Sequence, residues 1–285
     1  MPVVESLSPI AATRARPTPT SYWHSDAMRA RSALFDVYGD HLRSRANQAP
    51  VAALIRLLEP VGIAAPAVRT AISRMAAQGW LEPIRVAASP GYRATPRAIE
   101  RLSEAAGRIY RRTSEPWDGR WRLAFVDLPG DRGARGRLRQ ELAFLGHAEH
   151  APGVWLCPFD RPELDTVVAR AGGRARHAIA VELRPDPVAA WDLTGLAASY
   201  AGWPDEADDL LRTELARHDD EEEASFAARF RLVHEWRKFL FADPGLPDEL
   251  LPADWPGGPA AELFTSEARR LKPASDRFVA RCLGA

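Results

Sequence analysis

The strictest limit on the fold comes from residues 66–78, where apolar side chains recur at the spacing of one face of an α-helix. Successive helical residues are turned by about 100°, so one narrow arc holds Val68, Ala71, Ile72 and Met75. The opposite arc holds Arg69, Thr70, Ser73 and Arg74. Gly79 follows, at a position where helices commonly end in glycine. The segment therefore predicts a helix with an apolar seam and a basic outer face.

Two helices are predicted before this one and a β-hairpin after it. The helices span residues 27–43 and 51–58, and Pro50 opens the second because proline suits the first turn of a helix. The hairpin joins extended segments at 80–86 and 92–95 through a stretch whose Pro90-Gly91 pair signals a turn. Three helices followed by a hairpin form the layout of a winged helix-turn-helix.

The pattern changes after Glu115-Pro116, where strands and helices begin to alternate. Strands are predicted at 121–128, 153–157 and 178–183, with a weaker one near Ala148, and helices at 132–145 and 161–171. This β-α-β-β-α-β order is typical of a ferredoxin-like domain, and the chain is mostly helical from residue 189 onward. We expect an α+β protein made of a disordered arm (1–26), a winged helix-turn-helix domain (27–112), a ferredoxin-like middle domain (117–187) and a helical C-terminal domain (188–285).

Charge and composition narrow the partners. The formal net charge is +0, but arginines crowd the N-terminal third and acidic residues gather later, and such asymmetry favours nucleic-acid binding by the basic part. No apolar run approaches the about 20 residues that a membrane-spanning helix needs. The two cysteines, Cys157 and Cys282, match no metal-ligand spacing. We expect a cytoplasmic protein with no membrane contact, no cofactor and no metal.

A helix with a basic outer face suits the major groove of DNA, where arginine donates two hydrogen bonds to guanine and serine or threonine reaches phosphates or base edges. Arg69, Thr70, Ser73 and Arg74 are the expected contacts on the helix. The hairpin is expected to touch the DNA backbone or minor groove through Arg85, Ser89, Tyr92 and Arg93. From the residues alone, a face that is merely solvated remains the alternative.

Five stretches of the chain carry a family resemblance. They are FDVYGDHLR (35–43), AVRTAISRMAAQGWLEP (67–83), EPWDGRWRLAFVDLP (115–129), APGVWLCP (151–158) and RLVHEWRKFLFADPGLPDELLPADWPG (231–257). In this order they resemble the repressors of phenylacetic acid degradation, the PaaX-like family of transcriptional regulators, from about residue 27 to the end. The resemblance implies a homodimeric repressor of a catabolic operon that binds a palindromic double-stranded DNA operator. In the founding members the inducer is phenylacetyl-coenzyme A.

A small-molecule effector of the acyl-coenzyme A class follows from that resemblance. Such a thioester needs arginines for its phosphates and aromatic or aliphatic walls for its acyl group. The candidate contacts are Arg120, Trp121, Arg122, His234, Trp236 and Arg237. A core or interface role is the alternative for the tryptophans, and a hydrogen-bonded helix position is the alternative for His234.

Two further functions were weighed against the regulator. We expect no enzyme, since neither a nucleophile elbow nor a zinc-ligand pair is present. The enzymatic alternative is a metal-dependent nuclease: the middle domain is similar in predicted fold to small dimeric CRISPR-associated subunits, and Asp127 ends its first strand. The other alternative is a protein-interaction module that docks a basic partner on the acidic run 219–223, although acids at a helix start also stabilise its dipole.

Overall fold

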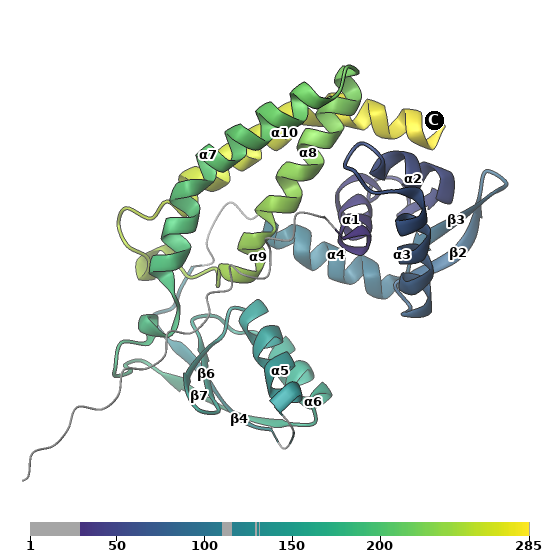
Figure 1. Cartoon of the computed structure of the whole chain (residues 1–285). Helices are drawn as coiled ribbons and strands as arrows, with labels where there is room; N and C mark the ends of the chain where they lie inside the picture. The colour runs from purple at the N-terminus through teal and green to yellow at the C-terminus, as the bar shows by residue number, and fades with distance from the viewer. Residues whose placement is uncertain (1–28, 110–115, 129, 131, 285) are drawn as a thin grey trace, which may run out of the picture.

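The structure is a computed structural model that describes residues 29–109, 116–128, 130 and 132–284. Helices predominate and two small sheets lie in separate parts of the molecule (Figure 1), so the expected α+β class is confirmed. The expected arm, residues 1–26, lies outside the described residues.

The N-terminal part contains helices and a three-stranded antiparallel sheet in the order β1-β3-β2. Its elements are α1 (Ala30–Asp36), the π-helical turn η2 (Val37–His41), β1 (Gln48–Pro50), α2 (Val51–Leu58), α3 (Ala65–Ala77), β2 (Leu81–Val86), β3 (Ser89–Ala94) and α4 (Pro96–Ile109). The predicted helices and hairpin are all present. Strand β1 was not predicted, and its three residues pair with β3.

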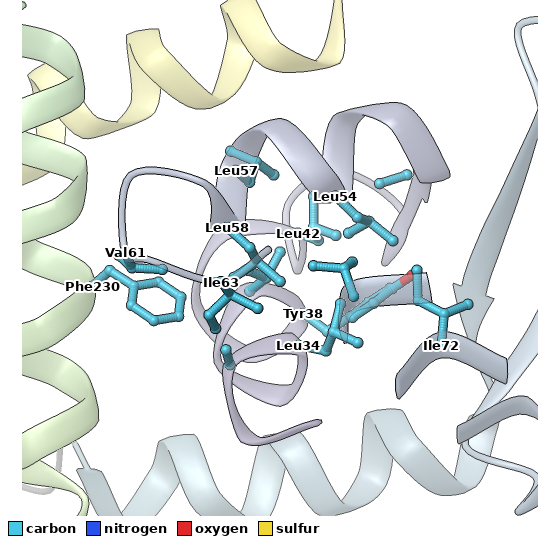
Figure 2. Packing of buried hydrophobic residues seen from close by; sticks show 14 of the residues in the cluster. Leu34, Tyr38, Leu42, Leu54, Leu57, Leu58, Val61, Ile63, Ile72 and Phe230 are labelled. Carbon is cyan, nitrogen blue, oxygen red and sulfur yellow. The ribbon is translucent and has the colours of Figure 1, made fainter. Parts of the chain in front are cut away.

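The apolar seam of α3 is buried as its spacing predicts. Its members Val68, Ala71, Ile72 and Met75 enter one cluster with side chains of α1, η2 and α2, part of which Figure 2 shows. Tyr38 in this cluster donates a hydrogen bond from its hydroxyl to the carbonyl of Tyr92, at 3.0 Å. The same core therefore anchors both α3 and the hairpin.

The turn of the hairpin is not where the sequence placed it. The loop between β2 and β3 is Ala87-Ala88, both with positive φ (45° and 66°), as a two-residue hairpin turn with matching twist requires. Pro90 and Gly91 lie inside β3 instead. Gly91 is needed there because a Cβ atom would come within 2.7 Å of the carbonyl oxygen of Ala49 on β1.

The middle part is ferredoxin-like, as expected. Its elements are β4 (Trp121–Asp127), α5 (Arg132–Phe144), β5 (Ala148–Ala151), β6 (Val154–Cys157), α6 (Glu163–Arg170) and β7 (Arg174–Ala180). The sheet order is β5-β6-β4-β7 with every pair antiparallel. The weak strand near Ala148 is confirmed, but the last strand begins earlier than predicted, because Gly172 (φ 83°) ends the turn after α6 and β7 follows at once.

The C-terminal part consists of η3 (Pro187–Ala190), α7 (Leu193–Arg217), α8 (Glu221–Trp236), α9 (Lys238–Ala242), η4 (Asp248–Leu250) and α10 (Gly257–Leu283). Helices α7 and α10 run beside each other and both pack on α8 (Figure 1). The sequence predicted two helices where α7 is continuous through Pro204. Tyr200, Trp203 and Ala207 are buried on both sides of that proline, so packing outweighs the about 3 kcal/mol that an interior proline costs.

The N-terminal core continues into the C-terminal helices. Phe226 and Phe230 of α8 and Phe278 and Val279 of α10 belong to the same cluster as the seam of α3, and Figure 2 shows Phe230 beside Val61. A shared core couples the two parts mechanically, because close-packed side chains transmit displacements.

Candidate nucleic-acid interface

The outer face of α3 is free of covering elements in the described structure. Arg69, Thr70, Ser73 and Arg74 are all exposed, as their spacing predicts. Thr70 donates its hydroxyl hydrogen to the carbonyl of Pro66 at 2.9 Å, so that proton is already in use. The two arginines and Ser73 are therefore the stronger hydrogen-bond donors of this face.

The hairpin contributes two kinds of residue. Arg85 and Ser89 are exposed near its tip, and Arg85 donates to the carbonyl of Ala88. Tyr92 is half-buried against the core, and Arg93 is held on the sheet by Gln48 at 3.2 Å and by Glu82 at 3.5 Å. The structure thus brings Arg85 and Ser89 to the tip, whereas Tyr92 and Arg93 are engaged within the sheet.

Helix α4 fixes the base of the hairpin. The guanidinium of Arg97 lies over the Trp80 ring, 4.4 Å from its centroid, and Phe35 meets the same ring edge-on at 5.4 Å. Thr95 reinforces the junction by donating from its hydroxyl to the carbonyl of Gly79 at 2.9 Å. These contacts set the angle between α3 and the hairpin.

Sequence reasoning missed a group of charged side chains between the N-terminal part and α8. Asp36 accepts a hydrogen bond from Nδ1 of His234 at 2.7 Å and another from Arg237. Asp40 pairs with Arg229. The one available signal was the placement of Asp36 and Arg229 among apolar neighbours in their helices, where charged residues are seldom buried unless paired.

Arg229 is buried despite its charge. Its Nε donates to the carbonyl of Ala268 at 3.0 Å and its Nη2 to Oδ1 of Asp40 at 3.0 Å. Burial lowers the pKa of Arg229 to about 10, which still leaves the guanidinium charged near neutral pH. The ion pair with Asp40 therefore ties η2 to α8 and α10.

The first three predicted effector contacts lie at the start of β4. Trp121 is buried, with its ring 5.3 Å from that of Trp117 and 6.1 Å from that of Trp191. Arg122 makes a two-pronged contact with Asp118 at 2.6 and 2.8 Å, and chiefly this hydrogen bonding lowers the pKa of Asp118 to about 2. Arg120 is exposed.

The other three lie at the end of α8 and just after it. Trp236 is buried in the helical core, stacked on Phe264 with ring centroids 4.6 Å apart. His234 and Arg237 both bind Asp36. The six residues thus occupy two places, one on the sheet of the middle part and one at the contact between α8 and α1.

The residues behind the alternative functions are also located. Asp127 is exposed at the end of β4, and among the described residues no group of three or more His, Cys, Asp or Glu side chains is arranged to hold a metal ion. The acidic run 219–223 begins α8: Asp220 accepts from the backbone of Glu223 at 2.8 Å and pairs with Arg281, while Glu222 pairs with Arg277 and Arg281 of α10. This run has a structural role within the chain.

Comparison with known proteins agrees with this architecture. The sequence model of PaaX-like protein matches residues 29–98, that of the PaaX protein central Cas2-like domain matches residues 114–184, and that of the PaaX-like protein C-terminal domain matches residues 191–281. The architecture is that of a three-part α+β protein in which a basic helix face stands beside a β-hairpin. The chain belongs to the family of PaaX-like proteins.

Two relatives extend over most of the chain. Transcriptional repressor PaaX of Escherichia coli K12 is 29% identical over 262 residues, which cover 87% of this chain and 82% of the relative. A solved structure, that of the uncharacterized protein Rv0674 from Mycobacterium tuberculosis, is similar with a TM-score of 0.55 and 28% identity, over 88% of this chain and 99% of the other. Among the helices in the described ranges, none is both long and apolar enough to cross a lipid bilayer.

Proposed function

We propose that this protein is a DNA-binding transcriptional regulator, a repressor that acts in the cytoplasm and has no enzymatic activity. The observation that carries the proposal is the exposed face of α3, with Arg69, Ser73 and Arg74, beside a hairpin with Arg85 at its tip. This face lies within residues 29–98, which match the PaaX-like model. A relative with 29% identity is a transcriptional repressor.

In the proposed complex, α3 enters the major groove as the recognition helix of a winged helix. Arg69 and Arg74 donate to guanine edges or phosphates, and Ser73 and Thr70 make secondary contacts. Arg85 and Ser89 reach the backbone beside the groove, while Tyr92 and Arg93 support the hairpin from within its sheet. The protein acts as a homodimer on a palindromic operator whose half-sites lie about one or two helical turns apart.

The proposed effector is an aryl- or acyl-coenzyme A thioester made in the catabolic pathway under control, such as that of phenylacetate. Among the candidate contacts, Arg120 is exposed, and the side chains of His234 and Arg237 are 19% and 21% exposed. An anionic group bound by His234 and Arg237 competes with Asp36 for both. It therefore binds better when α1 has moved away from α8, and such a difference in affinity between two states is what release from DNA requires.

The test is DNA binding by the purified full chain, measured by fluorescence anisotropy on fragments upstream of its own gene over a series of salt concentrations. Arg69→Ala and Arg74→Ala should each cost roughly 1–3 kcal/mol on the specific site, and a lost phosphate contact should also reduce the salt slope by about one. Arg212→Ala, at an exposed arginine of α7, is the matched control and should bind as the wild type does. Equal affinity and salt slope for all four proteins would refute the role of α3.

A second experiment tests the effector. A panel of aryl- and acyl-coenzyme A thioesters is added to the protein–DNA complex, with free coenzyme A as the control for the nucleotide part. We expect one thioester class to dissociate the complex while free coenzyme A does not. If no thioester changes the affinity for a fragment that the protein binds specifically, the proposed effector class is wrong and the DNA-binding function stands.

A further inference from the structure

The sheet of the middle part has two edges that differ in protection. The β5 edge carries a register irregularity between Glu149 and Ala151, and η3 packs against it. The β7 edge is regular, since all seven residues of Arg174–Ala180 pair with β4 in one unbroken register. Within the described ranges, no strand pairs with the outer side of β7. A regular free edge presents N–H and C=O groups that readily pair with another strand.

Apolar exposure is concentrated at the end of the same edge. Three large hydrophobic side chains are exposed in the described part of the chain, and two of them are Ile179 at 63% and Val181 at 76%. His177 shares their face, because alternate residues of a strand point the same way, and it contacts Asp165 of α6 at 2.9 Å. Helix α6 therefore reaches His177 on this face and leaves Ile179 and Val181 in solvent.

We infer that β7 pairs with β7 of a second copy of this chain, antiparallel and centred on Ala178. This inference specifies the surface of the homodimer that the proposed function assumes. The pairing places Ile179 opposite His177 of the second copy and Val181 opposite Ala175, so apolar surface is removed from water on the face of α6. It joins two four-stranded sheets into one continuous sheet, with the helices of both copies on the same side.

Charge selects this register. With Ala178 at the centre, Arg174 lies opposite Glu182 of the second copy on the same face, and two-fold symmetry repeats the pair. Opposite charges directly across an antiparallel pair are stabilising, and like charges are destabilising. Centring the pair on Ile179 instead would oppose Arg174 and Arg184, and centring it on His177 would leave Glu182 opposite Gly172. A strand whose own residues complement one another fits a second copy better than an unrelated partner.

The first test is the oligomeric state of the full chain by sedimentation equilibrium. The double variant Ile179→Lys/Val181→Lys adds charge at positions already exposed, so it should fold normally by circular dichroism and raise the dimer dissociation constant at least tenfold. Ala198→Lys/Ala201→Lys adds the same charge at exposed positions of α7 and is the control. A wild-type protein that is monomeric at tens of micromolar, or lysine variants that dimerise like the control, would overturn the inference.

The second test addresses the register. Mild oxidation should convert Ala178→Cys into a disulfide-linked dimer, because residue 178 faces its own copy, whereas Ala180→Cys, on the same face two positions along, should remain largely unlinked. Arg174→Glu and Glu182→Arg should each weaken dimerisation, and the double variant should restore it. Equal linking at both positions, or no recovery in the double variant, counts against the register.

The dimer surface and the DNA-binding function fail in different experiments. The Ile179→Lys/Val181→Lys protein should still bind a single half-site through α3, with a salt slope per chain like that of the wild type. If it sediments as a monomer and binds the half-site, the dimer surface is supported. If the wild type binds no upstream fragment, the proposed function fails while the sedimentation result on β7 is unaffected.

Discussion

Nδ1 of His234, on α8, donates a hydrogen bond at 2.7 Å to the carboxylate of Asp36, which ends α1. Arg237 donates to the other oxygen of the same carboxylate. The Asp36 side chain is only 4% exposed, so the first helix of the N-terminal part is held against α8 by a charged contact that water barely reaches. Movement of α8 therefore bears directly on the helices that position α3.

Replacing Asp36 by asparagine should destabilise the fold by about 3 kcal/mol, because breaking a buried ion pair leaves its cationic partners without a counter-charge. The free energy of unfolding from urea titration measures this. Asp118→Asn, which breaks the exposed pair with Arg122, is the matched control and should change stability far less. Equal effects of the two substitutions would show that the contact with α8 adds little to stability.

How much of this molecule follows from its sequence depends on how local each feature is. The buried and exposed faces of α3 are predicted correctly, since Val68, Ile72 and Arg69 obey the helical period within one segment. The position of the hairpin turn is predicted wrongly, because Gly91 answers to Ala49 on a strand 42 positions earlier in the chain (91 − 49) and not to its neighbour Pro90.

The contact between Asp36 and His234 spans 198 positions, and no local pattern announces a pair so far apart. The same reason explains why the candidate effector residues separate into two places. Trp121 and Trp236 are apolar anchors of different clusters, which the sequence alone does not distinguish from the walls of a binding site.

The close approach at Gly91 predicts a large effect of a small substitution. In Gly91→Ala the new Cβ would lie 2.7 Å from the oxygen of Ala49 and 2.9 Å from Cγ2 of Val86, so β1 and the hairpin must separate, at a cost of about 1–3 kcal/mol. Gly136→Ala in α5 meets no atom within 4 Å and should stabilise the protein by about 0.5–1 kcal/mol. Thermal unfolding of the two variants should shift in opposite directions, and a shift in the same direction would contradict the geometry of β1.

Two buried histidines predict a loss of stability in acid. Burial lowers the pKa of His41 and of His147 to about 4, and for His41 it outweighs the nearby carboxylates of Asp276 and Asp36. The unfolded chain binds these protons below about pH 6.5, so between pH 6.5 and 4 it holds more protons than the native state, and stability falls as the pH falls. Each histidine contributes about 1.4 kcal/mol per pH unit in that window.

The acid effect is measured as the free energy of unfolding at pH 7, 6, 5 and 4.5. His41→Phe should flatten the curve, because phenylalanine fits between Phe226 and Phe230, whose rings lie 4.9 and 6.3 Å from that of His41, and has no proton to bind. The part of the slope due to His147 should remain. An unchanged pH dependence in His41→Phe would mean that His41 is protonated in the native protein at these pH values.

The pair of Arg229 and Asp40 allows the charged contact to be separated from packing. Arg229→Met should cost about 3–5 kcal/mol, because it removes the guanidinium from a carboxylate that is 12% exposed. Asp40→Leu should also destabilise, since it leaves Arg229, 5% exposed, beside an apolar side chain. The double variant should lose less than the sum of the single losses by about 1–3 kcal/mol, as expected for residues in direct contact. Additive losses in urea titration would mean that the two side chains act independently and that packing alone holds η2 against α8.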